Sequence, residues 1–105
     1  MSWRTDISKN VRELRFIFCQ TSQHSKGVRG FVQNNYLDIK EKNPETPFIV
    51  RECLNAQPTV MARYDFGVEK RVYVNNLSES EINQVVKELV EQAREVNAAI
   101  PNRGL

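Results

Sequence analysis

Two cysteines, Cys19 and Cys53, are the side chains of this sequence best suited to chemistry. Each ends a short run of strand-forming residues, 14–19 and 47–53, and a helical pattern separates the two runs. If the runs are parallel neighbours in one sheet, both sulfurs lie at the carboxyl edge of the strands, where α/β proteins usually carry functional groups. The layout predicts either a thiol pair within disulfide range, with Cα atoms about 4.4–6.8 Å apart, or two separate reduced thiols.

Cys19 is also a candidate nucleophile, because a thiol at a helix N-terminus has a lowered pKa. The segment Cys19-Gln20-Thr21-Ser22 lacks the second cysteine of a C-x-x-C motif, and as C-x-x-S it resembles a monothiol glutaredoxin. The alternative is a small buried apolar side chain. His24 has no second ligand at metal-binding spacing. With no triad, carboxylate pair or phosphate-binding loop in the sequence, we predict no enzyme activity, no metal site and no cofactor.

The elements that position these cysteines follow from the hydrophobic pattern. A strand over 13–19 is followed by a helix that ends at Asn43-Pro44, because proline cannot continue it. The remaining predicted elements are strands at 47–53, 59–65 and 70–74, and a helix that begins after Ser78 with an S-x-x-E capping box and runs towards Pro101. The order β-α-β-β-β-α predicts an α/β, thioredoxin-like fold: a mixed four-stranded sheet with the first strand central and the helices packed on it.

Pro58 precedes the predicted third strand, where thioredoxin-like folds keep a cis-proline. It is our candidate cis-proline, and the alternative is a trans proline that starts a strand. Arg51 and Arg63 fall in or beside strands, where arginine either pairs with a nearby carboxylate or anchors a partner's acidic groups. Both are therefore candidate partner contacts.

The chain's 105 residues allow one domain, which we divide into an N-terminal arm (1–12), the domain itself (13–97) and a C-terminal tail (98–105). No apolar run reaches the ~20 residues that a membrane span needs. The net charge of +2 comes from 15 basic and 13 acidic residues that are interspersed, which argues against nucleic-acid binding. Residues 2–10 and those beyond 101 should be disordered in a free domain, so order there would indicate clamping by neighbouring proteins.

Taken together, these features resemble one family, the small thioredoxin-like accessory subunits of mitochondrial complex I. The match covers about residues 11–96. The segments that carry it are 14–20, 27–31, 43–44, 47–53, 57–58 and 62–64, with Gly67 and Glu69.

The resemblance implies a non-catalytic subunit of NADH:ubiquinone oxidoreductase, on the matrix side of the mitochondrial inner membrane. Its partner would be the large iron–sulfur subunit of the NADH-oxidising module, with no nucleic acid bound and no membrane insertion. Cys19 and Cys53 would correspond to two family cysteines that can be disulfide-linked. Two alternatives stay open: a mitochondrial ribosomal protein of the same domain type, which would need more phosphate-neutralising residues, and a free thiol oxidoreductase.

Overall fold

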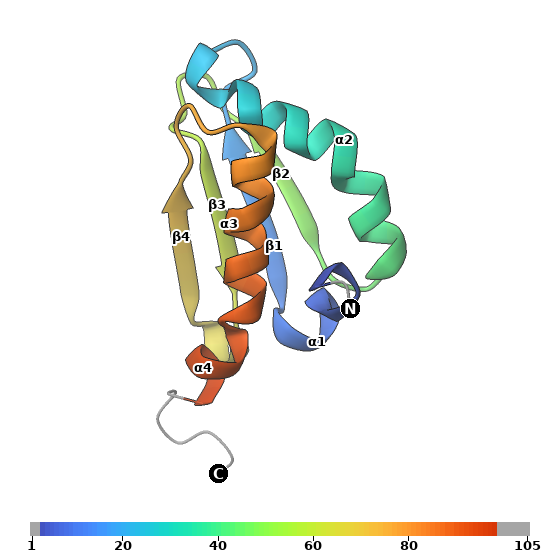
Figure 1. Ribbon diagram of the computed structural model, residues 1–105. Helices are drawn as coiled ribbons and strands as arrows, with labels where there is room; N and C mark the ends of the chain where they lie inside the picture. The colour runs from blue at the N-terminus through green and yellow to red at the C-terminus, as the bar shows by residue number, and fades with distance from the viewer. Residues whose placement is uncertain (1–2, 99–105) are drawn as a thin grey trace.

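The computed structural model describes residues 3–98 and shows an α/β domain with a mixed four-stranded sheet (Figure 1). The strands are β1 (Glu13–Phe18), β2 (Phe48–Glu52), β3 (Thr59–Arg63) and β4 (Glu69–Tyr73). Their order is β2-β1-β3-β4, with β1 parallel to β2 and antiparallel to β3, and β3 antiparallel to β4. The predicted mixed sheet with a central first strand is confirmed.

Two longer helices, α2 (Lys26–Lys42) and α3 (Glu79–Glu91), form the second layer. The capping box at the start of α3 is confirmed: the Ser78 hydroxyl accepts from the Glu81 amide at 3.2 Å, and the Glu81 carboxylate accepts from the Ser78 amide at 3.0 Å. The prediction of one continuous last helix is wrong, because α3 ends before Gln92 and α4 (Ala93–Ala98) follows. After this break, Asn97 accepts a hydrogen bond from the backbone amide of Asp65 at 3.0 Å.

The remaining short elements are 3-10 turns and one helical turn: η1 (Trp3–Asp6), α1 (Ile7–Asn10), η2 (Gln23–Ser25) and η3 (Asp65–Gly67). Within residues 3–98, no helix has the length and hydropathy required to cross a membrane.

The core lies between the helices and one face of the sheet. Phe16 on β1 is fully buried and stacks on Phe31 of α2 and Phe48 of β2, with ring centroids 5.8 and 4.8 Å apart. Gly27 lets α2 approach the segment before α3, because a Cβ atom at this position would lie 1.8 Å from the carbonyl oxygen of Leu77. Leu14, Phe16 and Phe18 are alternate residues of β1 and all are buried. Their side chains therefore determine which face of the sheet the helices cover.

The N-terminal segment belongs to this core, which differs from the predicted arm over residues 1–12. Ile7 and Val11 are 0% and 1% exposed and pack in the same apolar cluster as the sheet and the long helices. They are four residues apart, so a single helical turn presents both side chains to the domain. The segment therefore packs on its own domain, and additional contacts from neighbouring proteins stay a prediction. The predicted C-terminal tail lies largely outside the described residues.

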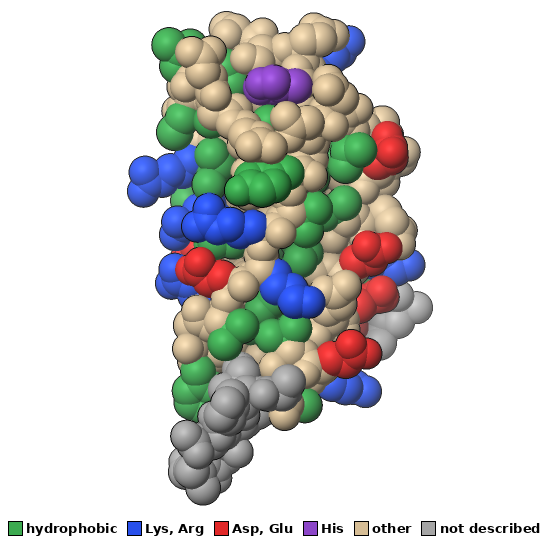
Figure 2. All heavy atoms as spheres, turned by 90° about the vertical axis from the view of Figure 1, so that its left-hand side faces the viewer, with side chains coloured by type: hydrophobic (Ala, Val, Ile, Leu, Met, Phe, Trp, Pro, Cys, Tyr) green, Lys and Arg blue, Asp and Glu red, His purple; other side chains and the backbone are tan. Residues whose placement is uncertain are grey.

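The opposite side of the sheet, which we call the open face, is not covered by any described helix. Helices α2 and α3 lie together on the other side (Figure 1). The open face carries alternate residues of the four strands: Glu13, Arg15 and Ile17; Ile49 and Arg51; Thr59, Met61 and Arg63; and Glu69, Arg71 and Tyr73. Figure 2 looks at the β4 side, and basic side chains gather towards the edge of that view that faces away from the helices.

Candidate functional site

Cys19 lies immediately after β1 and is fully buried in a polar loop. Its sulfur accepts hydrogen bonds from the Ser22 hydroxyl at 3.0 Å and from the Asn55 backbone amide at 3.4 Å. The Cys19 amide donates to the Ser25 hydroxyl at 3.2 Å, and Arg29 on α2 donates to the carbonyl oxygens of Cys19 and Ser22 at 2.8 and 2.7 Å. The loop is thus held rigidly around the sulfur.

This environment favours the thiolate form of Cys19. The Ser22 hydroxyl makes the largest contribution, followed by the backbone amides of Thr21 and Asn55, and together they lower the pKa of the thiol from 9.0 to about 6, although burial opposes the shift. Hydrogen bonds to a charged acceptor stabilise the charge directly. The hydrogen bonds therefore favour the thiolate, whereas the burial of the side chain opposes it.

Cys53 follows β2, and its side chain is exposed. Phe18 and Glu52 are the last paired residues of the parallel register, and the Cys53 amide continues the ladder with a 2.9 Å bond to the Phe18 carbonyl. Cys19 and Cys53 are thus the next residues on adjacent parallel strands, as predicted. Both are free thiols in this structure, and disulfide formation stays a prediction.

Pro58 is not a cis-proline, so this prediction is wrong: no peptide bond in the described chain is cis. Pro58 is buried just before β3, and its carbonyl oxygen accepts a hydrogen bond from the Val74 amide at 2.9 Å. A trans proline at the first position before a strand leaves the ladder intact. His24 contacts the Ser25 hydroxyl through Nδ1 at 3.2 Å, and residues 3–98 contain no cluster of three metal-ligating side chains.

The two candidate partner arginines differ in their surroundings. Arg63 lies 3.0 Å from Glu69 and 3.8 Å from Glu13, so carboxylates of its own domain already surround its charge. Arg51 is exposed on the edge strand β2, and no described carboxylate forms an ion pair with it. Arg51 is the candidate whose charge is available to a partner.

Chemically, the cysteine edge can hold a stabilised thiolate. With a local rearrangement and an external oxidant that takes up two electrons, the two thiols could also lose their protons and form a disulfide. Attack on an external substrate requires access to the sulfur, and the Cys19 sulfur is enclosed by its loop. The arrangement fits a structural or redox-responsive thiol better than a turnover site.

Known proteins resemble this chain over most of its length. The family model of the mitochondrial ribosomal protein L51 / S25 / CI-B8 domain matches residues 28–79. The NADH dehydrogenase (ubiquinone) 1 alpha subcomplex subunit 2 of Arabidopsis thaliana is 46% identical over 90 residues, 86% of this chain and 93% of that protein. This chain belongs to the alpha subcomplex subunit 2 family.

Two further comparisons bear on the choice between the alpha subcomplex subunit 2 family and the ribosomal alternative. The NADH-ubiquinone oxidoreductase 10.5 kDa subunit of Neurospora crassa is 41% identical over 90 residues, 86% of this chain and 96% of that protein. The large ribosomal subunit protein mL43 of Mus musculus is 27% identical over 85 residues, but these cover 46% of that protein. The alpha subcomplex subunit 2 family therefore accounts for this chain better than the ribosomal family does.

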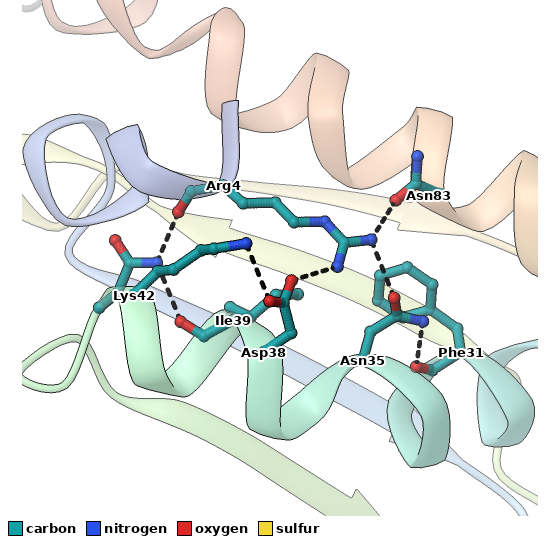
Figure 3. Close-up of polar contacts among 8 residues, drawn as sticks. Arg4, Phe31, Asn35, Asp38, Ile39, Lys42 and Asn83 are labelled. Carbon is teal, nitrogen blue, oxygen red and sulfur yellow. Dashed lines mark hydrogen bonds and ion pairs between the residues drawn. The ribbon is translucent and has the colours of Figure 1, made fainter. Parts of the chain in front are cut away.

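Sequence reasoning missed one polar junction in this alpha subcomplex subunit 2 homologue (Figure 3). Arg4 donates to Asp38 and Asn35 on α2, at 2.7 and 2.9 Å, and to Asn83 on α3 at 2.8 Å. Its own carbonyl accepts from the Asn43 side chain at 2.6 Å. These partners lie at 31 to 79 residues along the chain from Arg4, so no local motif marks them. Asn35 and Asp38 are three residues apart and so lie on the same side of α2, which is a local signal that could have indicated a bound cation.

Proposed function

We propose that this chain is a non-catalytic accessory subunit of mitochondrial NADH:ubiquinone oxidoreductase, complex I. The observation that carries the proposal is the match at 41–46% identity to proteins named as subunits of this enzyme, over nearly their whole length. A domain of this size with a single core fits a subunit that acts by occupying a place in an assembly.

The finer placement rests on the family resemblance. We propose that the subunit sits in the matrix arm, peripheral to the inner membrane, against the large iron–sulfur subunit of the NADH-oxidising module. The observed strand order and the parallel β1–β2 pair support a thioredoxin-like domain. The shielded sulfur of Cys19 supports a role without turnover.

Assembly tests this proposal. A tagged form of the chain is expressed in cells that lack their own alpha subcomplex subunit 2, and mitochondrial membranes are solubilised and separated under native conditions. We expect the tag to migrate with NADH dehydrogenase activity. Migration with ribosomal RNA would instead establish the ribosomal alternative, and steady turnover of the purified chain with glutathione or thioredoxin reductase would contradict the non-catalytic role.

A redox-responsive role is a second candidate, because the two thiols follow paired residues of adjacent parallel strands. Exchange with an external disulfide, which takes up the two electrons and two protons and leaves as two thiols, would join Cys19 and Cys53. The loop closed in this way is stabilising by about 3–4 kcal/mol in the chain-entropy model. We expect Cys19→Ser to lower the melting temperature of oxidised protein and to change that of fully reduced protein little. An equal effect in both states would mean that no disulfide forms.

A further inference from the structure

The open face carries exposed arginines on its outer strands, whereas Thr59 and Met61 at its centre are buried, at 4% and 1% exposed. In the register of the sheet, Arg51 on β2 and Ile17 on β1 share one row with Tyr73 on β4, and Ile49 shares the next row with Arg71. Tyr73 is 60% exposed although it is a large aromatic residue. Since β2 and β4 are three strand spacings apart, the two edge strands that carry the outer arginines are about 14 Å apart.

At one end of the open face the arginines are paired with carboxylates, and at the other end they are not. Glu13 and Glu69 flank Arg63, and Glu13 also binds Arg15 at 2.9 Å. Arg51 and Arg71 have no carboxylate within ion-pair distance in the described part of the chain. The unpaired positive charge is therefore confined to the two rows beyond the carboxylates.

The open face has a net positive charge. Four arginines and two glutamates lie on it, so its formal charge is +2. This equals the formal net charge of the whole sequence. A locally uncompensated charge of this kind selects a partner of opposite sign.

Arg15, in the middle of the face, supplies an independent observation. Its Nε is buried and has no hydrogen-bond acceptor, although its terminal nitrogen binds Glu13. A buried donor without an acceptor is destabilising by about 1–3 kcal/mol in mutational data, and native structures contain few such groups. In the free domain this donor stays unsatisfied, and the Arg15 side chain can gain an acceptor only if it shifts.

We propose that the open face binds an acidic segment of a neighbouring protein, with carboxylates against Arg51 and Arg71 and an apolar side chain against the exposed ring of Tyr73. A second copy of this chain is a poor partner, because the two carboxylates of the open face, Glu13 and Glu69, already pair with Arg15 and Arg63. The proposal deepens the accessory role above and rests on it for the source of the partner, a protein subunit of the assembled enzyme.

Charge reversal with a matched control tests the proposal in the assembly experiment. The test variant is Arg51→Glu with Arg71→Glu, and the control is Lys26→Glu with Arg94→Glu. Lys26 and Arg94 are exposed helical residues on the covered side of the sheet, with no ion pair to a described residue. Both variants change the net charge by the same amount, and both are first required to unfold with the wild-type melting temperature.

We expect the open-face variant to be recovered with NADH dehydrogenase activity at a level at least about tenfold below wild type, and the control to match wild type. If both variants assemble normally, the open face is not the interface and this inference fails, while the accessory role stands. If both fail equally, net charge and not the face decides assembly, which also overturns the inference. A wild-type chain that does not assemble would refute the proposed function itself.

Cys53 gives a second readout that needs no mutation. It follows β2 one residue after Glu52, beside Arg51, and is exposed in the free domain. Alkylation with a maleimide, followed by mass spectrometry of the peptides containing each cysteine, should label Cys53 in the free chain and much less in the assembled complex. Equal labelling of Cys53 in both states would contradict burial of this edge of the open face.

Discussion

Replacement of Arg4 by alanine should destabilise the whole domain, because this one guanidinium joins the N-terminal segment to both long helices. Its side chain is 19% exposed and reaches Asp38, Asn35 and Asn83. Two hydrogen bonds from a partly buried cation to neutral amides, with a further contribution from the solvent-facing ion pair, give a loss of about 2–3 kcal/mol in the free energy of unfolding. For a domain of this length, that corresponds to a melting temperature lower by about 10 °C or more.

Urea unfolding followed by circular dichroism measures the loss, with an unchanged m-value showing that the folded state stays compact. Lys9→Ala is the matched control: this side chain is 77% exposed and lies 3.8 Å from Asp6, so its removal should change stability by less than about 0.5 kcal/mol. Arg4→Lys should fall between the two, because an ammonium can pair with Asp38 but lacks the planar fork that reaches both asparagines. If Arg4→Ala unfolds at the same urea concentration as Lys9→Ala, the junction contributes nothing and the reasoning fails.

Three further results are expected. Ile7→Ala should lower the free energy of unfolding by about 2–5 kcal/mol, because the side chain is fully buried. A loss below about 1 kcal/mol would mean that the N-terminal segment is not part of the core. Gly27→Ala should lower the melting temperature more than Gly30→Ala, since the new Cβ meets backbone at 1.8 Å in the first case and a flexible glutamate side chain at 2.2 Å in the second; equal effects would contradict the close helix approach. Ser22→Ala should raise the pKa of Cys19 above about 6, seen as a shift of the thiolate absorbance to higher pH. The pKa of Cys19 in the folded state is lowered from 9.0 to about 6, and the hydrogen bond from Ser22 is the largest cause. The stabilisation from this bond is therefore fully present above pH 9.0 and is lost as the pH falls through about 6. A stability difference between Ser22→Ala and wild type that does not depend on pH would contradict this reasoning.

The sequence was sufficient to predict the sheet because the relevant signals are local. The alternation around Phe16, the proline at 44 and the capping box at Ser78 are short-range patterns, and each led to the observed element. The parallel pairing of the two cysteine-ended strands followed from the helix between them, and the register confirms it.

The features that sequence analysis did not predict depend on contacts between distant segments. Ile7 and Val11 form only one helical turn, too short for a periodic signal, and their burial becomes evident once α2 and the sheet are in place. The trans bond at Pro58 departs from what a fold analogy suggested. The concentration of charge on the open face arises from the register of four strands and is not visible along the chain, where the two signs alternate.

The central position of β1 has a consequence for the order in which the chain can fold. Although it is the first strand, β1 is flanked by β2 and β3, so its second edge stays unpaired until residue 63 is available. The apolar face of the finished sheet is then covered in part by α3, with Ile82, Val86 and Val90 in the core. A chain that emerges N-terminus first therefore exposes an apolar, unpaired strand during most of its synthesis or translocation. This is the condition under which chaperones are needed. A product truncated before residue 79 would retain the strands but lack the helix that shields them, and we expect it to aggregate and be degraded rather than persist as a smaller domain.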